Sequence, residues 1–472
     1  MSTFSGLNTA MTGLNAARIG IETTGNNIIN VNTPGYTRQR AELSAVGALA
    51  STGLIVTRPS LGQGVSVSGI ARLADAHLDA RLNATSGAVG MADTRAAALM
   101  DIENTLREPG ENGLSALLGK FWNAWEGVAN HPGEASQATV LISSAKDVAS
   151  RLALMHGELS DQWSTQRSGL NTMVSEVNST AAQVAELNGN IRATMTAGGN
   201  ANEMLDRRAM LVNRLAELSG ATSATNADGT IEVKLGNQSL VAGTSHSELK
   251  ATGSEQLSGA TNDPPRLTLD GNDVDSVGGR VAGALSLLAP ADPEGNGTGG
   301  AIAEMAASLD AVAENLVTTV NTVHKEGFTV ADQTQKNFFD PDQTTAAGLS
   351  VIVSSAAELA TKSSAGAGKL DGSNALKLAD LANEDGGPDK VWSGVVVSAG
   401  LAAQAEAQQA VTAAVAHSAA AAQQQASAGV SLDEENVALL AYQHAYQGAA
   451  RVMTAVDEML DTLINRTGIV GR

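Results

Sequence analysis

Apolar residues recur every seven positions near the start of the chain, and this repeat constrains the fold more than any other feature of the sequence. One set of positions in the repeat holds Leu7, Leu14, Ile21 and Ile28, and the intervening set holds Ala10, Ala17 and Thr24. A heptad repeat places a continuous seam along one side of an α-helix, and such a seam packs against another helix. The sequence therefore predicts an amphipathic first helix with a helical partner.

A turn is expected where this helix stops. Asn32 and Thr33 precede Pro34 and Gly35, and Tyr36 follows. Proline presets the φ angle of the first central residue of a turn, and glycine permits the positive φ that a type II turn requires at the second. We therefore predict a type II turn centred on Pro34 and Gly35.

A second heptad seam occupies the other end of the chain. Ser431, with Glu434 three residues later, has the spacing of a capping box at a helix start. Apolar residues then alternate at spacings of three and four: Leu439, Tyr442, Tyr446, Ala449, Met453, Val456, Leu460 and Leu463. Two readings remain open, namely that the seams bury in an ordinary helical bundle or that they are surfaces for assembly. We also predict frayed ends in the monomer, because such helices are marginal alone.

Composition limits the partners of the chain. Aromatic residues make up only 3% of the 472 residues, so burial must rely on Ala, Leu and Val in closely approaching helices. The formal net charge of -20 repels phosphate backbones and anionic lipids, so neither nucleic acid nor a membrane is an expected partner. Cysteine is absent, which excludes disulfides. The first residues lack the pattern of a secretory signal peptide, and we expect none to be cleaved.

Periodicity divides the chain into helical ends and a β-rich insertion. Helical patterns cover residues 170–196, 202–218, 302–324 and 401–426, and helical periodicity also resumes near residue 71. Short alternating runs such as Ile231, Val233 and Leu235 indicate strands. The predicted fold class is mainly α with a β-rich insertion (α+β): terminal helices forming a coiled coil, a central helical bundle and a small β-rich domain.

The predicted domains follow from this pattern. They are a helix and turn for assembly (1–36), an arm with a long-helix bundle (37–220), a β-rich module (221–290), return helices with an irregular segment (291–427) and a C-terminal assembly helix (428–472).

Catalytic and metal-binding patterns are weak. The seven histidines are dispersed and none forms a zinc signature. Gly366, Gly368 and Lys369 lack the Ser or Thr of a phosphate loop, and the acidic run from Asp270 lacks the final glutamate of a calcium loop. We predict no cofactor, no metal and no enzymatic activity, against the alternative of a secreted enzyme with a β-rich catalytic domain.

Aromatic residues near position 121 suggest two roles. Phe121, Trp122 and Trp125 share helical spacing with neighbouring leucines, which favours a core anchor over a recognition patch. Tyr36 and Arg38 follow the predicted turn, and they either contact another subunit or pack the turn.

Both ends of the chain resemble a known family. Asn26 to Tyr36, with the sequence NNIINVNTPGY, resembles the N-terminal signature of the flagellar rod, hook and hook-associated proteins. The run from Ser431 to Leu463 resembles the partner signature at the C-terminus. Ile29 departs from the pattern, because the family commonly has alanine there, and this places a bulkier side chain in the first helix.

Interior segments resemble the hook-associated branch of this family at the junction of hook and filament. They are Gly62 to Arg72, Asn202 to Leu215, and Asn321 to Gly327. Rod and hook subunits are the alternative, and they are expected to lack the last element. Ala209 departs from the pattern, since an acidic residue often follows Arg208 in the family.

The resemblance implies a structural role outside the cell. It implies a subunit that forms a ring or tube with its own copies, binds the hook protein and a second junction hook-associated protein, and supports filament assembly. It also implies export through the flagellar channel and a cytoplasmic chaperone at the C-terminal helix. The residues expected at subunit contacts are Leu7, Leu14, Ile21, Asn27, Ile28, Asn30, Pro34, Gly35, Tyr36, Arg38, Leu439, Tyr442, Tyr446, Arg451, Met453, Val456, Leu460 and Leu463.

Overall fold

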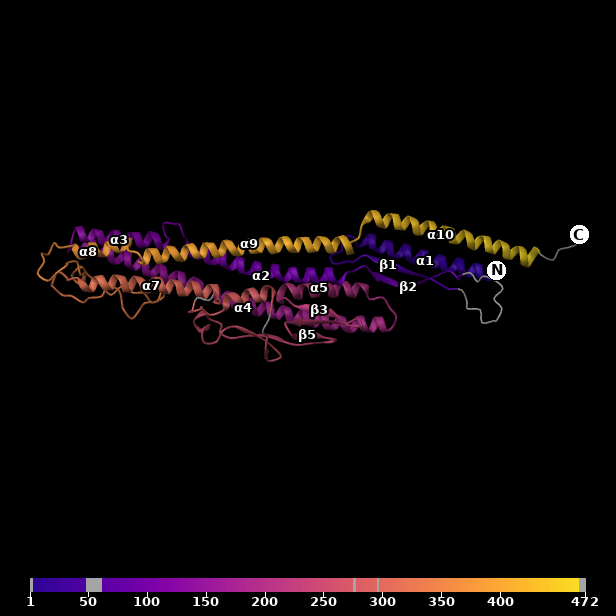
Figure 1. Ribbon diagram of the computed structural model, residues 1–472, viewed down its shortest axis with the longest axis horizontal. Coiled ribbons are helices and arrows are strands. Elements are labelled where there is room, and N and C mark those ends of the chain that lie inside the picture. The colour runs from indigo at the N-terminus through magenta and orange to yellow at the C-terminus, as the bar shows by residue number, and fades with distance from the viewer. Residues whose placement is uncertain (1–2, 48–61, 275–276, 295–296, 467–472) are drawn as a thin grey trace, which may run out of the picture.

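The two ends of the chain lie side by side at one end of a long rod (Figure 1). The computed structural model describes residues 3–47, 62–274, 277–294 and 297–466. Helix α1 spans Thr3–Ile29 and helix α10 spans Leu432–Asp461, followed by a π-helical turn at Thr462–Arg466. These two helices pack against each other and not into the helical body. The terminal helices therefore pair with each other. This arrangement does not match the first interpretation, in which both seams are buried in an ordinary helical bundle.

Among the described residues, eight helices build the body of the rod. They are α2 (Ala76–Leu106), α3 (Leu114–Asn130), α4 (Ala135–Thr196), α5 (Asn202–Ser219), α6 (Gly279–Leu288), α7 (Ala301–Glu326), α8 (Ser373–Asp380) and α9 (Pro388–Ala428). Short 3-10 turns lie at Leu257–Gly259, Ala356–Glu358 and Leu381–Asn383. The fold is thus mainly α with a β-rich insertion, as predicted.

Local patterns identified some helix bounds and missed others. The predicted helices at 202–218 and 302–324 match α5 and α7 closely. Helix α4 ends at the predicted residue 196 but begins 35 residues before the predicted residue 170, and α9 begins at Pro388 instead of residue 401. Both earlier starts follow from packing, because Leu141 and Trp392 bury completely against the rest of the body.

A two-stranded arm connects α1 to the body. Strand β1 (Gln39–Ala45) pairs antiparallel with β2 (Val65–Arg72). Helix resumes at Ala76, slightly later than the predicted point near residue 71, because Ala71 still lies in β2 and pairs with Arg40. Helix α2 begins at Ala76, where the Asp75 side chain accepts hydrogen bonds from the backbone N–H groups of His77 and Leu78.

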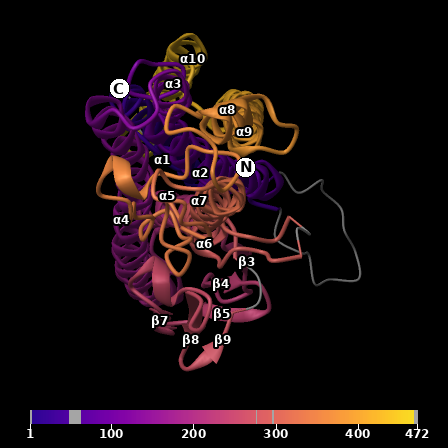
Figure 2. The same cartoon turned by 90° about the vertical axis from the view of Figure 1, so that its left-hand side faces the viewer.

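Beside the helices, seven short strands of the described chain form two small antiparallel sheets (Figure 2). One sheet contains β3 (Thr222–Thr225), β4 (Ile231–Leu235), β5 (Gln238–Ala242) and β6 (Ser245–His246), and the other contains β7 (Leu249–Thr252), β8 (Arg266–Leu269) and β9 (Asn272–Asp273). The last part of the predicted β-rich module, 279–288, is helical and forms α6. The division of the chain into domains stays a prediction.

Aromatic side chains fill the end of the body farthest from the terminal helices. Phe121 and Trp125 are fully buried, and the ring of Trp125 lies 5.2 Å from the ring of Phe338. This agrees with the predicted core anchor. Nearby, His324 is fully buried: its Nδ1 bonds to the Lys336 carbonyl and its Nε2 accepts the N–H of Ala360. The irregular segment that follows α7 is therefore held to the core through this histidine.

The two weak ligand motifs form turns in the structure. Asp270 and Gly271 both have positive φ, 49° and 87°, and they connect β8 to β9. Asp275 of the same motif lies outside the described residues. In the glycine-rich loop, the Gly366 N–H donates to Asp332, which also pairs with the buried Lys362. Within the part of the chain that the structure describes, no group of three or more metal-ligating side chains is close enough to hold an ion.

Candidate functional site

The terminal helices run antiparallel in a constant register. A Cβ added to Gly6 would meet Val456, one added to Gly13 would meet Ala449, and one added to Gly20 would lie 2.5 Å from the ring of Tyr442. The next pair in the same register is joined by the hydrogen bond that Asn27 donates to Glu435. Contacts spaced by seven on both helices are typical of a coiled-coil interface.

Small residues, and not the large ones, form the centre of this interface on α1. Ala10, Ala17 and Thr24 are buried, whereas the four large seam residues Leu7, Leu14, Ile21 and Ile28 are only partly buried. The glycines at 6, 13 and 20 lie between the buried positions and allow α10 to approach closely. The contact face therefore keeps the predicted set of Ala10, Ala17 and Thr24. The glycines take the place of the large residues that directly follow them in the chain, because close packing favours the smallest side chains.

The C-terminal seam is placed largely as its spacing predicts. Val456 is buried, and partly buried seam residues flank it, namely Leu439, Tyr442, Ala449, Met453 and Leu460. Tyr446 and Leu463 are exposed, as is Arg451. Tyr446 is exposed although it shares its heptad position with the partly buried Leu439, Met453 and Leu460. Leu463 lies in the π-helical turn after α10, one heptad beyond the last register contact with α1, at Val456.

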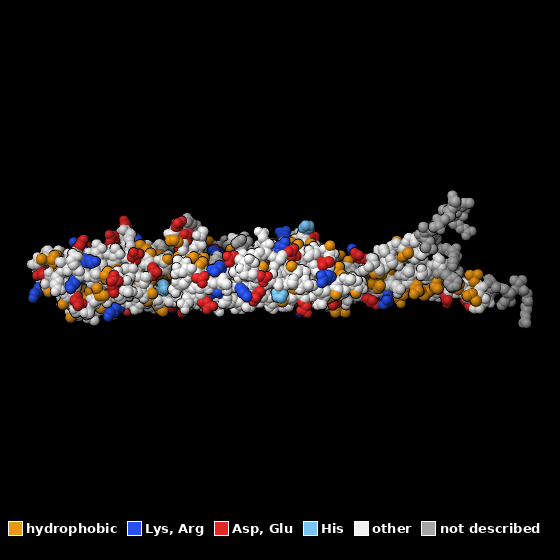
Figure 3. Space-filling model, turned by 90° about the horizontal axis from the view of Figure 1, so that it is seen from below, with side chains coloured by type: hydrophobic (Ala, Val, Ile, Leu, Met, Phe, Trp, Pro, Cys, Tyr) orange, Lys and Arg blue, Asp and Glu red, His pale blue; other side chains and the backbone are white. Residues whose placement is uncertain are grey.

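Large apolar side chains cover the outside of the helix pair. Val437 is 69% exposed and Ile29 is 79% exposed, so the bulky Ile29 makes no tight contact within the chain. Figure 3 shows hydrophobic side chains gathered over the terminal-helix end, while charged side chains are spread along the body. The other exposed apolar residues of the pair are Met11, Leu432, Leu440, Tyr446, Val452, Met459, Leu463 and Ile464. Exposed apolar surface of this kind marks a site of interaction.

A buried polar network fixes the base of the helix pair to the arm. The Asn27 amide nitrogen donates to the Gln39 carbonyl at 2.8 Å and to Glu435 at 2.9 Å. The amide oxygen of Asn27 accepts hydrogen bonds from the Tyr36 hydroxyl and from the Gln39 N–H. Asn27 is 1% exposed, and all the donor and acceptor positions of its amide are filled by protein partners without water.

Arg38 connects the same network to the start of α10. Its Nε lies 2.6 Å from Glu435, and another of its guanidinium nitrogens lies 2.5 Å from Glu434. Its backbone N–H donates to the carbonyl of Ala428, the last residue of α9. The predicted capping box at Ser431 does not form: the residue is the N-cap, but its side chain makes no capping hydrogen bond. The glutamate that would close the box, Glu434, binds Arg38 instead.

Asp206 of α5 joins the network to the body. One of its oxygens accepts the Thr37 N–H, and the other accepts from Arg72 at 2.5 Å. Burial, with the negative charges of Asp206 and Glu435, raises the pKa of Tyr36 to about 12. The Tyr36 hydroxyl therefore stays protonated and keeps its role as a donor to Asn27.

Two residues further along α5, on another side of the helix, Arg208 reaches the β-rich sheet. It donates to Asn188 of α4 and to the Gly229 carbonyl at 2.8 and 2.7 Å. Desolvation, with the nearby charge of Arg72, lowers the pKa of Arg208 to about 10. Asp206 and Arg208 thus anchor the arm on one side and the sheet on the other.

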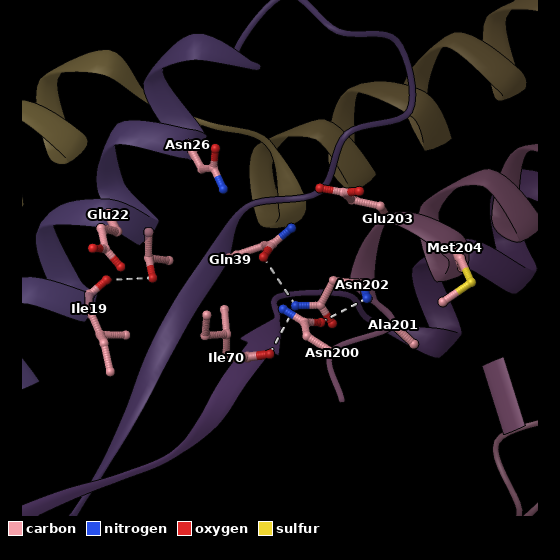
Figure 4. A pocket seen from close by; sticks show the side chains of 11 residues that line it. Ile19, Glu22, Asn26, Gln39, Ile70, Asn200, Ala201, Asn202, Glu203 and Met204 are labelled. Carbon is pink, nitrogen blue, oxygen red and sulfur yellow. Dashed lines mark hydrogen bonds between the residues drawn. The ribbon is translucent and has the colours of Figure 1, made fainter. Parts of the chain in front are cut away.

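A polar pocket of 310 Å³ lies where α1, the arm and the start of α5 meet (Figure 4). The Asn202 amide donates to the Gln39 side chain and to the Ile70 carbonyl, which closes the floor of the pocket. Glu22, Asn26 and Glu203 stand around it. Its position makes it part of the joint between the terminal helices and the body.

The predicted turn forms in the structure. Gly35 has a φ of 75°, and the Tyr36 N–H donates to the Thr33 carbonyl, as the predicted turn requires. Asn30 continues the end of α1 by donating to the Asn26 carbonyl and accepting from the Thr33 hydroxyl. The structure thus brings Asn27, Tyr36 and Arg38 together in one network, while Pro34 stays exposed in the turn.

Sequence reasoning missed several residues of this site. Glu435 is almost completely buried and joins both Asn27 and Arg38, yet it was not singled out. The three seam glycines were also missed, although their own seven-residue spacing in the printed sequence was a usable signal.

Comparisons with known proteins agree with this architecture. Residues 99–339 match the family model described as the helical domain of the flagellar hook-associated protein FlgK. Residues 7–37 match the flagella basal body rod protein model, and residues 423–466 match the C-terminal model of the flagellar basal body rod FlgEFG proteins.

Relatives named flagellar hook-associated protein 1 extend the match. The one from Bacillus subtilis is 30% identical over 508 aligned positions that cover all of both chains. The one from Salmonella typhimurium is 28% identical over 71% of this chain and 59% of its own length.

A solved structure shares the fold. It is that of the flagellar hook junction protein FlgK from Burkholderia pseudomallei, which aligns with a TM-score of 0.62 and 14% identity over 75% of this chain and 100% of that one. No described helix is long and apolar enough to cross a membrane. Together, the match over most of the helical body and the full-length relative show that the chain belongs to the flagellar hook-associated protein 1 family.

Proposed function

We propose that α1 and α10 form the surface through which copies of this chain assemble into a ring or tube on the flagellar hook. Because the chain belongs to this family, it is a structural subunit of the bacterial flagellum at the hook-filament junction. The observation that carries the proposal is the exposed apolar surface of the terminal helix pair, including Ile29, Val437 and Val452. Water solvates such a surface poorly, and contact with neighbouring subunits would bury it.

In this proposal, each part of the candidate site has its own task. The contacts at Gly6, Gly13 and Gly20 hold α1 and α10 together. The exposed side chains of the helix pair and of the turn that follows α10, including Tyr446, Arg451 and Leu463, contact other subunits. The network of Asn27, Arg38, Glu435 and Asp206 sets the direction of the helix pair relative to the body. A stiff joint favours assembly, because a fixed geometry lowers the entropy lost on binding.

The partners and location follow the same proposal. The chain binds the hook protein on one side and a second junction hook-associated protein on the other, and it acts outside the cell. It leaves the cell unfolded through the flagellar export channel without losing a signal peptide, and a cytoplasmic chaperone covers α10 before export. Terminal helices that order fully only on assembly would suit that route.

We also propose that the chain is not an enzyme. The titratable groups with shifted pKa values, such as Tyr36 and Arg208, are already satisfied by structural partners. A rod or hook subunit is the alternative structural role, and the match of residues 99–339 to the hook-associated helical domain favours the junction role.

Electron microscopy of cells that lack the gene tests the junction role, together with an assay for flagellin monomers in the medium. Hooks without filaments and shed flagellin are the expected result. Cells without hooks would instead identify a rod or hook component, and normal filaments would refute a role in joining hook to filament.

A further inference from the structure

Helix α9 exposes an apolar stripe on the side that faces away from the body. Its inner side packs on α2 through buried alanines, among them Ala403, Ala413 and Ala420. On the opposite side, Val397, Leu401, Val411 and Val415 are 58%, 61%, 57% and 65% exposed. Helical geometry places these four side chains in one row about 27 Å long.

The exposed face of α9 also lacks charge. Glu406 is the single Asp, Glu, Lys or Arg residue between Val391 and Ala428, and the one histidine of this stretch, His417, is only partly exposed. Glu406 points toward the body, where Arg95 of α2 lies 2.6 Å away and neutralises it. Gln404 and Gln408 are exposed between the apolar positions. A solvated helix ordinarily carries charged residues on its outer face, so this face differs from that of a helix that stays in water.

The lack of charge on this face favours a second copy of the chain as its partner. The whole chain carries a net charge of -20, so two copies repel each other wherever acidic faces meet. A neutral face can approach another copy without that cost, and glutamine amides can both donate to and accept from the copy they meet. A basic partner would instead be matched by an acidic face.

We propose that the outward face of α9, defined by Val397, Leu401, Val411 and Val415, is a second contact surface that binds a neighbouring copy of this chain. The inference rests on the proposed assembly and adds a contact along the body to the one at the terminal helices. Through this contact, copies pack side by side along the rod as well as at its end.

Crosslinking in assembled flagella tests this surface, because the natural chain has no cysteine. Single variants Val411→Cys, Leu401→Cys and Ser179→Cys carry a maleimide-benzophenone label, which captures any neighbouring protein. Ser179 is an exposed position on α4 and serves as the control. The expected result is a product of twice the chain mass from both α9 positions and none from the control.

Three results would overturn the inference. Capture of a protein of another mass would replace the copy with a different partner. If neither α9 position gives a crosslinked product in assembled flagella, no protein binds the apolar stripe. If the Ser179 control gives as much product as the α9 positions, the crosslinking is not specific to the stripe.

A fourth label separates this inference from the proposed function. Val452→Cys places the probe on the exposed face of α10. Products from Val452 without products from α9 would overturn the second surface alone, whereas products from neither helix would overturn both.

Charge insertion gives an independent readout. The pair Val411→Lys and Val415→Lys introduces unpaired charge into the proposed contact, and we expect on the order of tenfold fewer copies retained on isolated hooks. The matched pair Ser179→Lys and Gln183→Lys adds the same charge at exposed positions of α4 and should leave retention unchanged. Equal retention of the two pairs would contradict the inference, provided that their circular dichroism spectra match that of the natural chain.

Discussion

Asn27 in the first helix donates a hydrogen bond of 2.9 Å to Glu435, a residue 408 positions later in the chain. Both side chains are almost completely buried, and Arg38 completes the pairing by donating to the same carboxylate. This relationship joins the two ends of the chain at the point where the terminal helices meet the body.

Replacement of Asn27 by alanine should loosen the joint. It leaves the Gln39 carbonyl and one oxygen of Glu435 without their buried donor, which costs about 1–3 kcal/mol. Hydrogen exchange at the backbone of α1 and β1 should become faster, while exchange in α7 stays as it was. Asn26→Ala is the control, since Asn26 is exposed, and equal exchange in the two variants would contradict the assigned role of Asn27.

The two glutamates that bind Arg38 should differ in importance. Glu435→Gln removes a buried negative charge and leaves the positive charge of Arg38 poorly compensated. We therefore expect a loss of about 3 kcal/mol in the stability of the helix pair. Glu434→Gln should cost below about 1 kcal/mol, because the Glu434 side chain is 63% exposed and water screens its pairing. Limited proteolysis at the start of α10 measures both variants, and a larger effect at Glu434 would count against this account.

The close approach at Gly20 predicts opposite effects for two similar substitutions. Gly20→Ala puts a methyl group 2.5 Å from the Tyr442 ring and should separate α1 from α10, with a cost of about 1–3 kcal/mol. Gly25→Ala meets nothing within 4 Å and should stabilise α1 by about 0.5–1 kcal/mol, because alanine is the better helix former. Thermal denaturation followed by circular dichroism compares them. Stabilisation by both substitutions would show that α10 does not lie against Gly20.

His324 should make the far end of the body sensitive to acid. Burial lowers the pKa of His324 below its usual value near 6.5, since the charged ring is poorly solvated there. The unfolded chain therefore binds the proton first, and stability is lost as the pH falls below about 6.5 toward the folded-state pKa. The protection factor of the Ala360 amide, whose N–H bonds to the ring, should fall between pH 7 and pH 5 once the slower intrinsic exchange at acid pH is corrected for.

A matched pair of variants isolates this histidine. His324→Gln should reduce stability at pH 7 but flatten its change with pH, because the titrating group is gone. His77→Gln, at an exposed position, should leave the pH profile of the natural chain unchanged. An unaltered slope in the His324 variant would assign the acid sensitivity to another group.

The sequence by itself determined the features that depend on neighbouring residues in the chain. Apolar periodicity predicted α5 and α7 almost to the residue, and Pro34 with Gly35 predicted the turn. These features depend on local helix and turn preferences, which a short window of sequence contains. The terminal and interior signatures resembled the flagellar family to which the chain belongs.

Only the tertiary structure decided which residues of the first helix meet α10. The set Leu7, Leu14, Ile21 and Ile28 was predicted to face the partner helix, yet α10 packs on the residues one position earlier, because close approach of two backbones depends on the shape of both helices. For the same reason Glu434 serves Arg38 and not the helix cap, and Glu435 becomes the buried centre of the joint. Partners separated by hundreds of residues decide these roles, and no local pattern contains them.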